Sequence, residues 1–258
     1  MKKNLFITVI VMAIAGLLIS ACQPAAGSGT TGETSPTQGE SEATSAPAED
    51  ISNLEVLLDP ALVPDSEAIP YIYESLVKNM EGEDQPVSVL AIDGTVSEDG
   101  LDYIFNLRSG VTFHDGTQLN ADAVIANFNR WFDPQDPLRG SGDYQAWADN
   151  FGGFKGEVDA DGLPKSNFDG IEKVDDLTIL VHLNSPDPDF QYKLANTAFA
   201  IVSPAALSTP GFGTTAGVDG GTGPYVIGEF SSTSLTLEPN PDYWNPDAIP
   251  ASSIEVTP

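Results

Sequence analysis

Between Gln23 and Asp50 the chain has no aromatic residue and no Leu, Ile, Val or Met. A segment of this composition cannot bury enough apolar surface to offset the entropy that it loses on ordering, so we expect a flexible linker here. Any folded part must therefore lie in residues 51–258, which are enough for one large domain or two small ones.

The residues before this linker have the pattern of an export signal. Lys2 and Lys3 form a positive start, and a mostly apolar run follows from Leu5 to Ile19. This run is too short to cross a bilayer comfortably and has the length of the apolar part of a signal peptide. We therefore predict a lipoprotein signal peptide over residues 1–21.

Cys22 is the only cysteine of the chain, and small residues precede it. This arrangement resembles a bacterial lipobox, in which Cys22 would carry a lipid and become the mature N-terminus; an ordinary signal peptide with a chance cysteine is the alternative. The first interpretation makes residues 22–50 a lipidated cysteine and linker. It places the rest of the chain on a membrane surface, exposed to the periplasm or the cell exterior.

The chain is strongly acidic, with 38 Asp and Glu against 10 Lys and Arg and a net charge of −28. Binding to nucleic acid needs a basic face, which so few cations cannot build, so we expect no nucleic-acid partner. The acidity favours solubility outside the cell, and a basic partner or a cationic ligand is the other interpretation.

Short apolar strands and short helices alternate through residues 51–258. From Leu101 to Arg108 every second residue is apolar, which is typical of a strand with one buried face. Asn120 is a suitable N-cap, and an apolar stripe at helical spacing follows it as far as Phe132. Strands or hairpins are expected at 53–58, 86–92, 101–108, 171–183, 199–202, 225–238 and 254–256, and helices at 66–79, 120–132, 143–150 and 187–195.

The two histidines, His114 and His182, are candidates for acid–base chemistry. His114 precedes Asp115 and Gly116, so it could be a general base with its carboxylate, half of a metal site, or the corner of a hairpin. Neither histidine has neighbouring ligands at zinc-site spacing, and the chain has no Gly-x-Ser-x-Gly elbow. We therefore predict no metal, no cofactor and no enzymatic activity, and we interpret the Phe-His-Asp-Gly stretch as a structural corner.

Calcium is a further possibility for an acidic turn. Glu157, Asp159, Asp161 and Gly162 match positions 1, 3, 5 and 6 of an EF-type loop, but Phe168 stands where a bidentate Glu should close it. A solvated acidic turn is the simpler interpretation.

Aromatic residues gather in the irregular segment that follows the capped helix. Tyr144, Trp147, Phe151 and Phe154 lie there, between Gln135 and Gly170. A long segment without periodicity is commonly functional or disordered, and exposed aromatic side chains in it would suit a ligand-binding surface. Packing of the segment onto the domain is an equally open interpretation.

Several stretches, in order, resemble the extracellular solute-binding proteins that serve oligopeptide, dipeptide and nickel ABC importers. The most specific are Phe-His-Asp-Gly at 113–116 and Gly-Thr-Gly-Pro-Tyr at 221–225. The full set is YIYESLV (71–77), the block 89–134, VDDLTILVHLNSPDPDF (174–190), AIVSP (200–204), GTGPYVIGEF (221–230) and NPDYWN (240–245).

This resemblance implies an α/β, periplasmic-binding-protein-like fold of the type II, two-lobed kind. Residues 51–258 would form mainly the first lobe, with a mixed sheet and flanking helices. The chain would end about where the family crosses into its second lobe, so we expect it to bind a ligand weakly or not at all by itself.

The resemblance also implies a function without chemistry. The protein would be the substrate-binding lipoprotein of an ABC importer, which closes by hinge motion around a peptide or similar small solute and delivers it to a membrane permease. In this family the segment after the capped helix approaches the cleft, which makes Tyr144 and Trp147 candidate ligand contacts, with Phe199 as a weaker one. The other functions left open are an acidic surface lipoprotein that binds calcium or a protein partner, and a secreted hydrolase.

Overall fold

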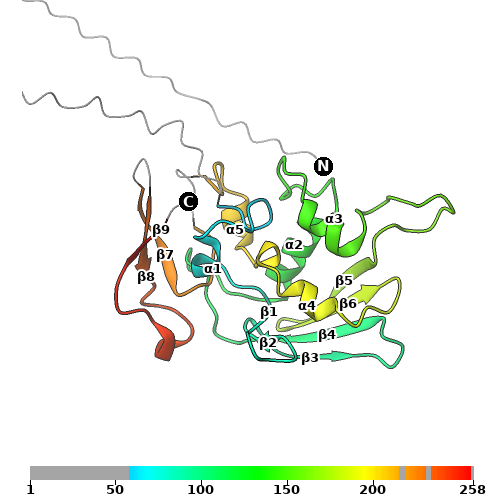
Figure 1. Ribbon diagram of the computed structural model, residues 1–258, viewed down its shortest axis with the longest axis horizontal. Helices are drawn as coiled ribbons and strands as arrows, with labels where there is room; N and C mark the ends of the chain where they lie inside the picture. Colours follow the sequence, from blue (N-terminus) through cyan, green and yellow to red (C-terminus); the bar gives the residue numbers. More distant parts are fainter. Residues whose placement is uncertain (1–57, 215–218, 231–233, 257–258) are drawn as a thin grey trace, which may run out of the picture. The chain divides into compact units, whose positions relative to one another are not determined.

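The computed structural model describes residues 58–214, 219–230 and 234–256. The predicted signal peptide, Cys22, the linker and most of the predicted strand at 53–58 lie outside these residues. The strands are β1 (Val77–Lys78), β2 (Val87–Ser88), β3 (Ala91–Val96), β4 (Asp102–Leu107), β5 (Phe168–Asp175), β6 (Thr178–Leu183), β7 (Tyr225–Phe230), β8 (Leu235–Pro239) and β9 (Ile254–Val256) (Figure 1). The helices are α1 (Ile69–Ile72), α2 (Ala121–Phe132), α3 (Gln145–Phe151), α4 (Phe190–Leu194) and α5 (Pro204–Leu207), with short 3-10 turns η2 (Thr197–Phe199) and η3 (Pro246–Ala248).

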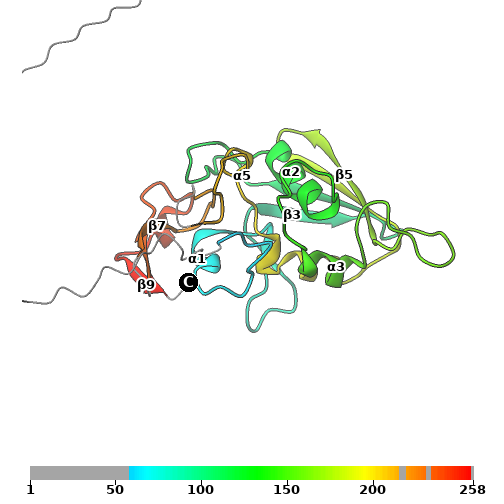
Figure 2. The ribbon, with the colours of Figure 1, turned by 90° about the horizontal axis from the view of Figure 1, so that it is seen from above.

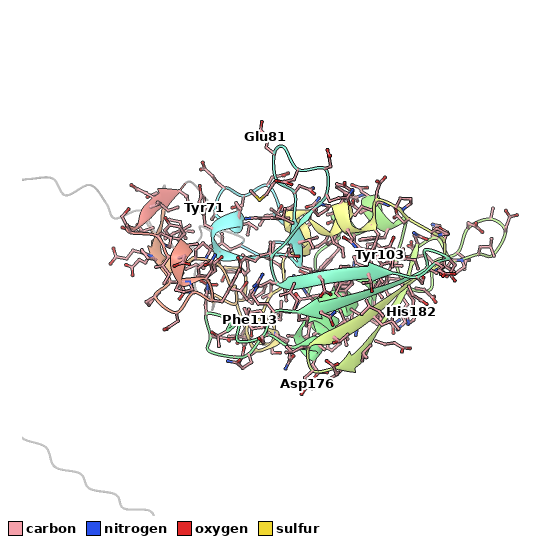
Figure 3. The ribbon with its side chains drawn as sticks, turned by 90° about the horizontal axis from the view of Figure 1, so that it is seen from below. Tyr71, Glu81, Tyr103, Phe113, Asp176 and His182 are labelled. Atoms are coloured by element: carbon pink, nitrogen blue, oxygen red, sulfur yellow. The ribbon has the colours of Figure 1, made fainter. Side chains whose placement is uncertain are left out.

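Four antiparallel strands form a sheet in the order β3-β4-β6-β5. Tyr103, Phe105 and Leu107 of β4 are buried while Ile104 between them is exposed, so the predicted strand with one buried face is confirmed. The predicted hairpin at 171–183 is also confirmed by the pairing of β5 with β6. Figure 3 shows the opposite face of the sheet, where His182 lies on β6 and no described helix crosses the strands.

Helix α2 covers the buried face of this sheet, against β5 and β6 (Figures 1 and 2). The Asn120 side chain accepts a hydrogen bond from the Ala123 amide at 2.9 Å, which confirms the predicted N-cap. Val124, Phe128 and Trp131 are buried at helical spacing. They join α3, α4 and the sheet in one apolar cluster, which we call the sheet cluster.

A second apolar cluster lies around the sheet β7-β8-β9. Ile69 and Ile72 of α1 pack there with Leu235 and Leu237 of β8, and α5 adds Ala206. We call it the hairpin cluster. The predicted hairpin at 225–238 and the predicted strand at 254–256 supply this sheet and are confirmed.

The helix predicted at 66–79 is wrong over most of its length. Only α1 is helical, and Tyr73 after it is already extended, with φ −120° and ψ 150°. Glu74 then forms a single antiparallel bridge with Ile201, and its carbonyl accepts the Ile201 amide at 2.9 Å. A pairing with a residue more than a hundred positions away thus overrides the helical spacing of the local apolar residues.

Two smaller predictions also need correction. The strand expected at 199–202 is instead the 3-10 turn η2 followed by that single bridge at Ile201. The helix expected at 187–195 is shortened to α4, because the Asp187 carbonyl accepts the Phe190 amide in a turn and also the Tyr103 hydroxyl at 2.8 Å.

A buried ion pair links α2 to the start of the described chain. Arg130 donates from both terminal nitrogens to the two carboxylate oxygens of Asp59, at 2.7 and 2.9 Å. Both side chains are buried, at 1% and 7% exposure. Burial by itself would lower the pKa of Arg130, but the Asp59 carboxylate outweighs that effect and raises it, so the guanidinium stays charged.

We expect Asp59→Asn to lower the free energy of unfolding by about 3–5 kcal/mol, because it leaves the Arg130 charge buried without its partner. Urea unfolding followed by circular dichroism measures this loss. Lys155→Gln is the matched control: it breaks an ion pair of similar length, 2.7 Å, whose lysine is 60% exposed. It should change stability by no more than about 1 kcal/mol. Equal effects of the two variants would contradict the prediction.

Candidate functional site

The Glu74 carboxylate is the centre of a polar junction between the sheet cluster and the hairpin cluster. Its Oε2 accepts hydrogen bonds from Thr222 Oγ1 at 2.9 Å and Trp244 Nε1 at 2.8 Å, and its Oε1 accepts from the Tyr243 hydroxyl at 2.7 Å. Burial raises the pKa of Glu74, although the three donors act to lower it. The contacts join the segment after α1 to two stretches that lie about 150 positions further along the chain.

The glycines beside Thr222 let the backbone approach this junction. A Cβ atom at Gly221 would lie 2.0 Å from the Ile72 carbonyl oxygen, and one at Gly223 would lie 2.5 Å from that of Tyr71. The Gly223 amide donates to the Ile72 carbonyl at 2.9 Å. Any larger residue would push the two segments apart and break the bonds to Glu74.

His114 is buried on the same junction. Its Nε2 lies 2.9 Å from the Gly223 carbonyl oxygen, and its Nδ1 lies 2.8 Å from Asp219 Oδ2, although the ring N–H does not point straight at that oxygen. Both ring nitrogens therefore face acceptors, which suits the doubly protonated imidazolium. Burial alone would lower the pKa of His114, but Asp219 and the carbonyl outweigh it and the net shift is upward.

Asp115 and Gly116 complete the corner that the sequence predicted. Asp115 Oδ1 accepts from the Thr117 amide at 2.9 Å, and Gly116 has a φ of 82°. Asp115 Oδ2 also accepts from the Ser203 hydroxyl. Burial acts to raise the pKa of Asp115, but these hydroxyl and amide donors lower it overall. The interpretation of Phe-His-Asp-Gly as a structural corner is confirmed. The corner also binds the segment at Ser203, a contact that the sequence did not indicate.

The acidic turn closes on itself. Asp159 Oδ1 accepts from the amides of Asp161 and Leu163 at 2.8 and 3.0 Å, and Glu157 accepts from the Phe154 amide at 3.2 Å. Over the described ranges, no three His, Cys, Asp or Glu side chains are grouped so that they could hold a metal ion.

The three predicted ligand contacts lie together in the sheet cluster. Tyr144, Trp147 and Phe199 are only 1%, 1% and 3% exposed, and the rings of Trp147 and Phe199 are 6.0 Å apart. The Tyr144 hydroxyl donates to the Arg139 carbonyl, and Trp147 Nε1 donates to the Gly153 carbonyl at 3.1 Å. The burial supports the packing role that the sequence left equally open. Contact with a solute stays a prediction that would require these segments to move.

Three hollows surround the junction, and the sequence pointed to none of them. A small one of about 200 Å³ lies between Glu74, Lys78 and Thr197, and one of about 560 Å³ lies between His114 and Tyr243. The largest is an open groove of about 730 Å³ lined by charged, polar and aromatic side chains: Asp93, Asn106, Arg108, Ser109, Thr178 and Trp244. The stretches that resemble the solute-binding proteins could have indicated these hollows, because each hollow is lined by residues from at least one of those stretches.

Comparison with known proteins assigns the family. Residues 85–258 match the model of bacterial extracellular solute-binding proteins, family 5, middle region. The chain belongs to this family. Family 5 membership confirms the predicted resemblance. No helix in the described ranges has both the length and the apolar character needed to span a membrane.

Relatives within family 5 agree in sequence and in fold. The glutathione-binding protein GsiB of Escherichia coli O1:K1 is 32% identical over 191 residues, which are 73% of this chain and 33% of GsiB. The peptide-bound DppA of Helicobacter pylori matches with a TM-score of 0.63 and 27% identity over 78% of this chain and 40% of that one. HbpA2 of Haemophilus parasuis matches with a TM-score of 0.66 and 26% identity over 79% and 41%.

These comparisons confirm the α/β, periplasmic-binding-protein-like fold class. The relatives are solute-binding proteins and not enzymes. The chain spans about a third of the length of the curated relatives that it matches.

From the contact between His114 and Asp219 we predict that the stability of the fold depends on pH. The folded-state pKa of His114 lies above its ordinary value of 6.5, so the folded state holds this proton more tightly than the unfolded state. The stabilisation is therefore fully present below about pH 6.5 and is lost as the pH rises through the folded pKa. Urea unfolding across this range should show the fall. His114→Gln should abolish the fall and His182→Gln should preserve it; a fall that survives in His114→Gln would contradict this assignment.

Proposed function

We propose that this chain is part of the substrate-binding lipoprotein of an ABC importer. It captures a peptide or similar small solute and delivers it to a membrane permease. The observation that carries the proposal is the 32% identity with GsiB, which is named for binding glutathione, itself a short peptide. The fold similarity to DppA, whose structure contains the peptide STSA, supports the same ligand class.

The mechanism follows from the way in which a two-lobed protein uses binding energy. A solute stabilises the closed form only through contacts that it makes in that form and loses in the open one. The Glu74 junction contributes by holding two apolar clusters as one rigid body, so that closure is a hinge motion and not a deformation of the lobe. Tyr144, Trp147 and Phe199 remain candidate contacts on this proposal, reached only when their segments open.

The lipid at Cys22 is the second part of the proposal. It would anchor the protein at a membrane, in the periplasm or at the cell exterior, where solutes arrive and the permease lies. The sequence pattern at residues 1–22 supports it.

Solute binding is tested by isothermal titration of the complete protein against glutathione, Ala-Ala, a tetrapeptide, a sugar and Ni²⁺. We expect a peptide to bind with a dissociation constant in the micromolar range. The 258-residue chain spans about a third of the length of its curated relatives, and on this proposal it should bind the same peptide at least about a hundredfold more weakly, because a shorter chain offers fewer contacts that stabilise closure. Turnover of a peptide or ester without stable binding would contradict the proposed function, and equal affinity of the two proteins would contradict the mechanism.

Lipidation is tested by metabolic labelling of cells with radioactive palmitate. The wild-type chain should carry the label and sediment with membranes, and Cys22→Ser should lose both properties because its hydroxyl cannot form the thioether. Ser20→Ala is the matched control and should keep the label. Label on Cys22→Ser, or none on the wild type, would contradict lipidation at Cys22.

A further inference from the structure

Arg108 is a half-buried cation without an ion pair in the described part of an acidic chain. Arg130, Lys155, Lys173 and Lys193 each form an ion pair with an aspartate. Within the described ranges, Arg108 forms none, and its two terminal nitrogens have no hydrogen-bond acceptor. Arg139 also forms no ion pair, but it donates from a terminal nitrogen to the carbonyls of Arg130 and Trp131, so Arg108 is distinguished by terminal nitrogens that meet no acceptor in the described ranges.

The position of Arg108 is fixed by contacts that leave its terminal nitrogens free. Its Nε donates to the Val89 carbonyl at 2.8 Å, and its guanidinium carbon lies 4.4 Å from the ring centroid of Trp244. Trp244 is in turn held by the bond from its Nε1 to Glu74. A planar donor pair stacked on a fixed indole loses little side-chain entropy when an acceptor arrives.

The guanidinium faces the open groove of about 730 Å³, which is described above. Asn106 and Thr178 offer amide and hydroxyl groups along the groove, and Leu177 adds apolar surface. Asp93 lies in the same groove, where its Oδ1 accepts from Asn106 Nδ2 at 2.6 Å. A carboxylate at this place disfavours a dianion such as phosphate and favours a ligand with a positive or donor group at its other end.

We propose that this groove is a binding subsite for the free carboxylate of a short zwitterion, an amino acid or dipeptide. The ligand carboxylate takes both terminal nitrogens of Arg108, and the ligand ammonium lies toward Asp93. Each named residue of the subsite lies in the described part of this chain, so the proposal can be tested on this chain without the proposed transport function.

The test uses the indole N–H signals of the full chain labelled with ¹⁵N-tryptophan. The chain has 3 tryptophans, and Trp244→Phe assigns the one signal that matters. Ala-Ala should shift the Trp244 signal in a saturable way, with a millimolar dissociation constant. Ala-Ala amide, which lacks the carboxylate, should bind at least about tenfold more weakly. Equal shifts with the two peptides, or no saturable shift, would overturn the subsite.

Two variants keep the test independent of folding. Arg108→Gln removes the charge and should abolish the saturable shift. Ser109→Glu leaves Arg108 in place and puts a competing carboxylate on an exposed groove residue, so it should weaken Ala-Ala at least about tenfold. Ser141→Glu makes the same change at an exposed position that does not line the groove, and it should bind like the wild type. Equal loss in both Glu variants would assign the effect to net charge and overturn the subsite.

Discussion

The half-buried carboxylate of Glu74 is the interaction that ties the two apolar clusters of the described chain together. An ionised group removed from water costs several kcal/mol unless donors replace the lost hydration. Three side-chain donors do so, from Thr222, Tyr243 and Trp244. A hydrogen bond to a charged group contributes about 1.5–3 kcal/mol, so the three together are of the size needed to hold the charge. Burial nevertheless raises the pKa of Glu74 against the effect of these donors, and the three bonds fix one arrangement of the segments that they join.

That arrangement explains why the most specific family stretches are structural. Phe-His-Asp-Gly lies more than a hundred positions before Gly-Thr-Gly-Pro-Tyr and Asn-Pro-Asp-Tyr-Trp, yet the three stretches meet around Glu74 and His114. His114 and Asn240 both bond to the Gly223 carbonyl, at 2.9 and 3.1 Å. These bonds hold the two apolar clusters in one relative position. For the proposed hinge mechanism this matters, because a part that deforms would absorb the binding energy that should move the hinge.

The parts of the fold that were predicted correctly are those controlled by neighbours in the sequence. The alternation in β4 and the Asn120 cap of α2 report on residues within one strand or one turn. The failure at residues 66–79 comes from the bridge between Glu74 and Ile201, which no local pattern reveals, and the strand expected at 199–202 is cut short by the 3-10 turn η2 that ends at Phe199. The candidate site was harder to predict than the fold, because the sequence of so acidic a chain does not distinguish a carboxylate that is buried from one that is solvated. Aromatic residues without periodicity were equally ambiguous, and Tyr144 and Trp147 proved to be core.

The acidity also sets how this protein can meet an anionic solute such as a peptide with a free carboxylate. A net charge of −28 repels it at long range, but at physiological salt that field decays over about 8 Å. Only cations at the point of contact then matter. Two arginines are buried and do not reach such a contact. Arg130 is neutralised inside the sheet cluster by Asp59, and Arg139 donates to the Arg130 and Trp131 carbonyls. The buried cations therefore serve packing, and on the proposed binding role the recognition of an anion falls to cations at the surface of the described chain, among which Arg108 is held by Val89 and Trp244.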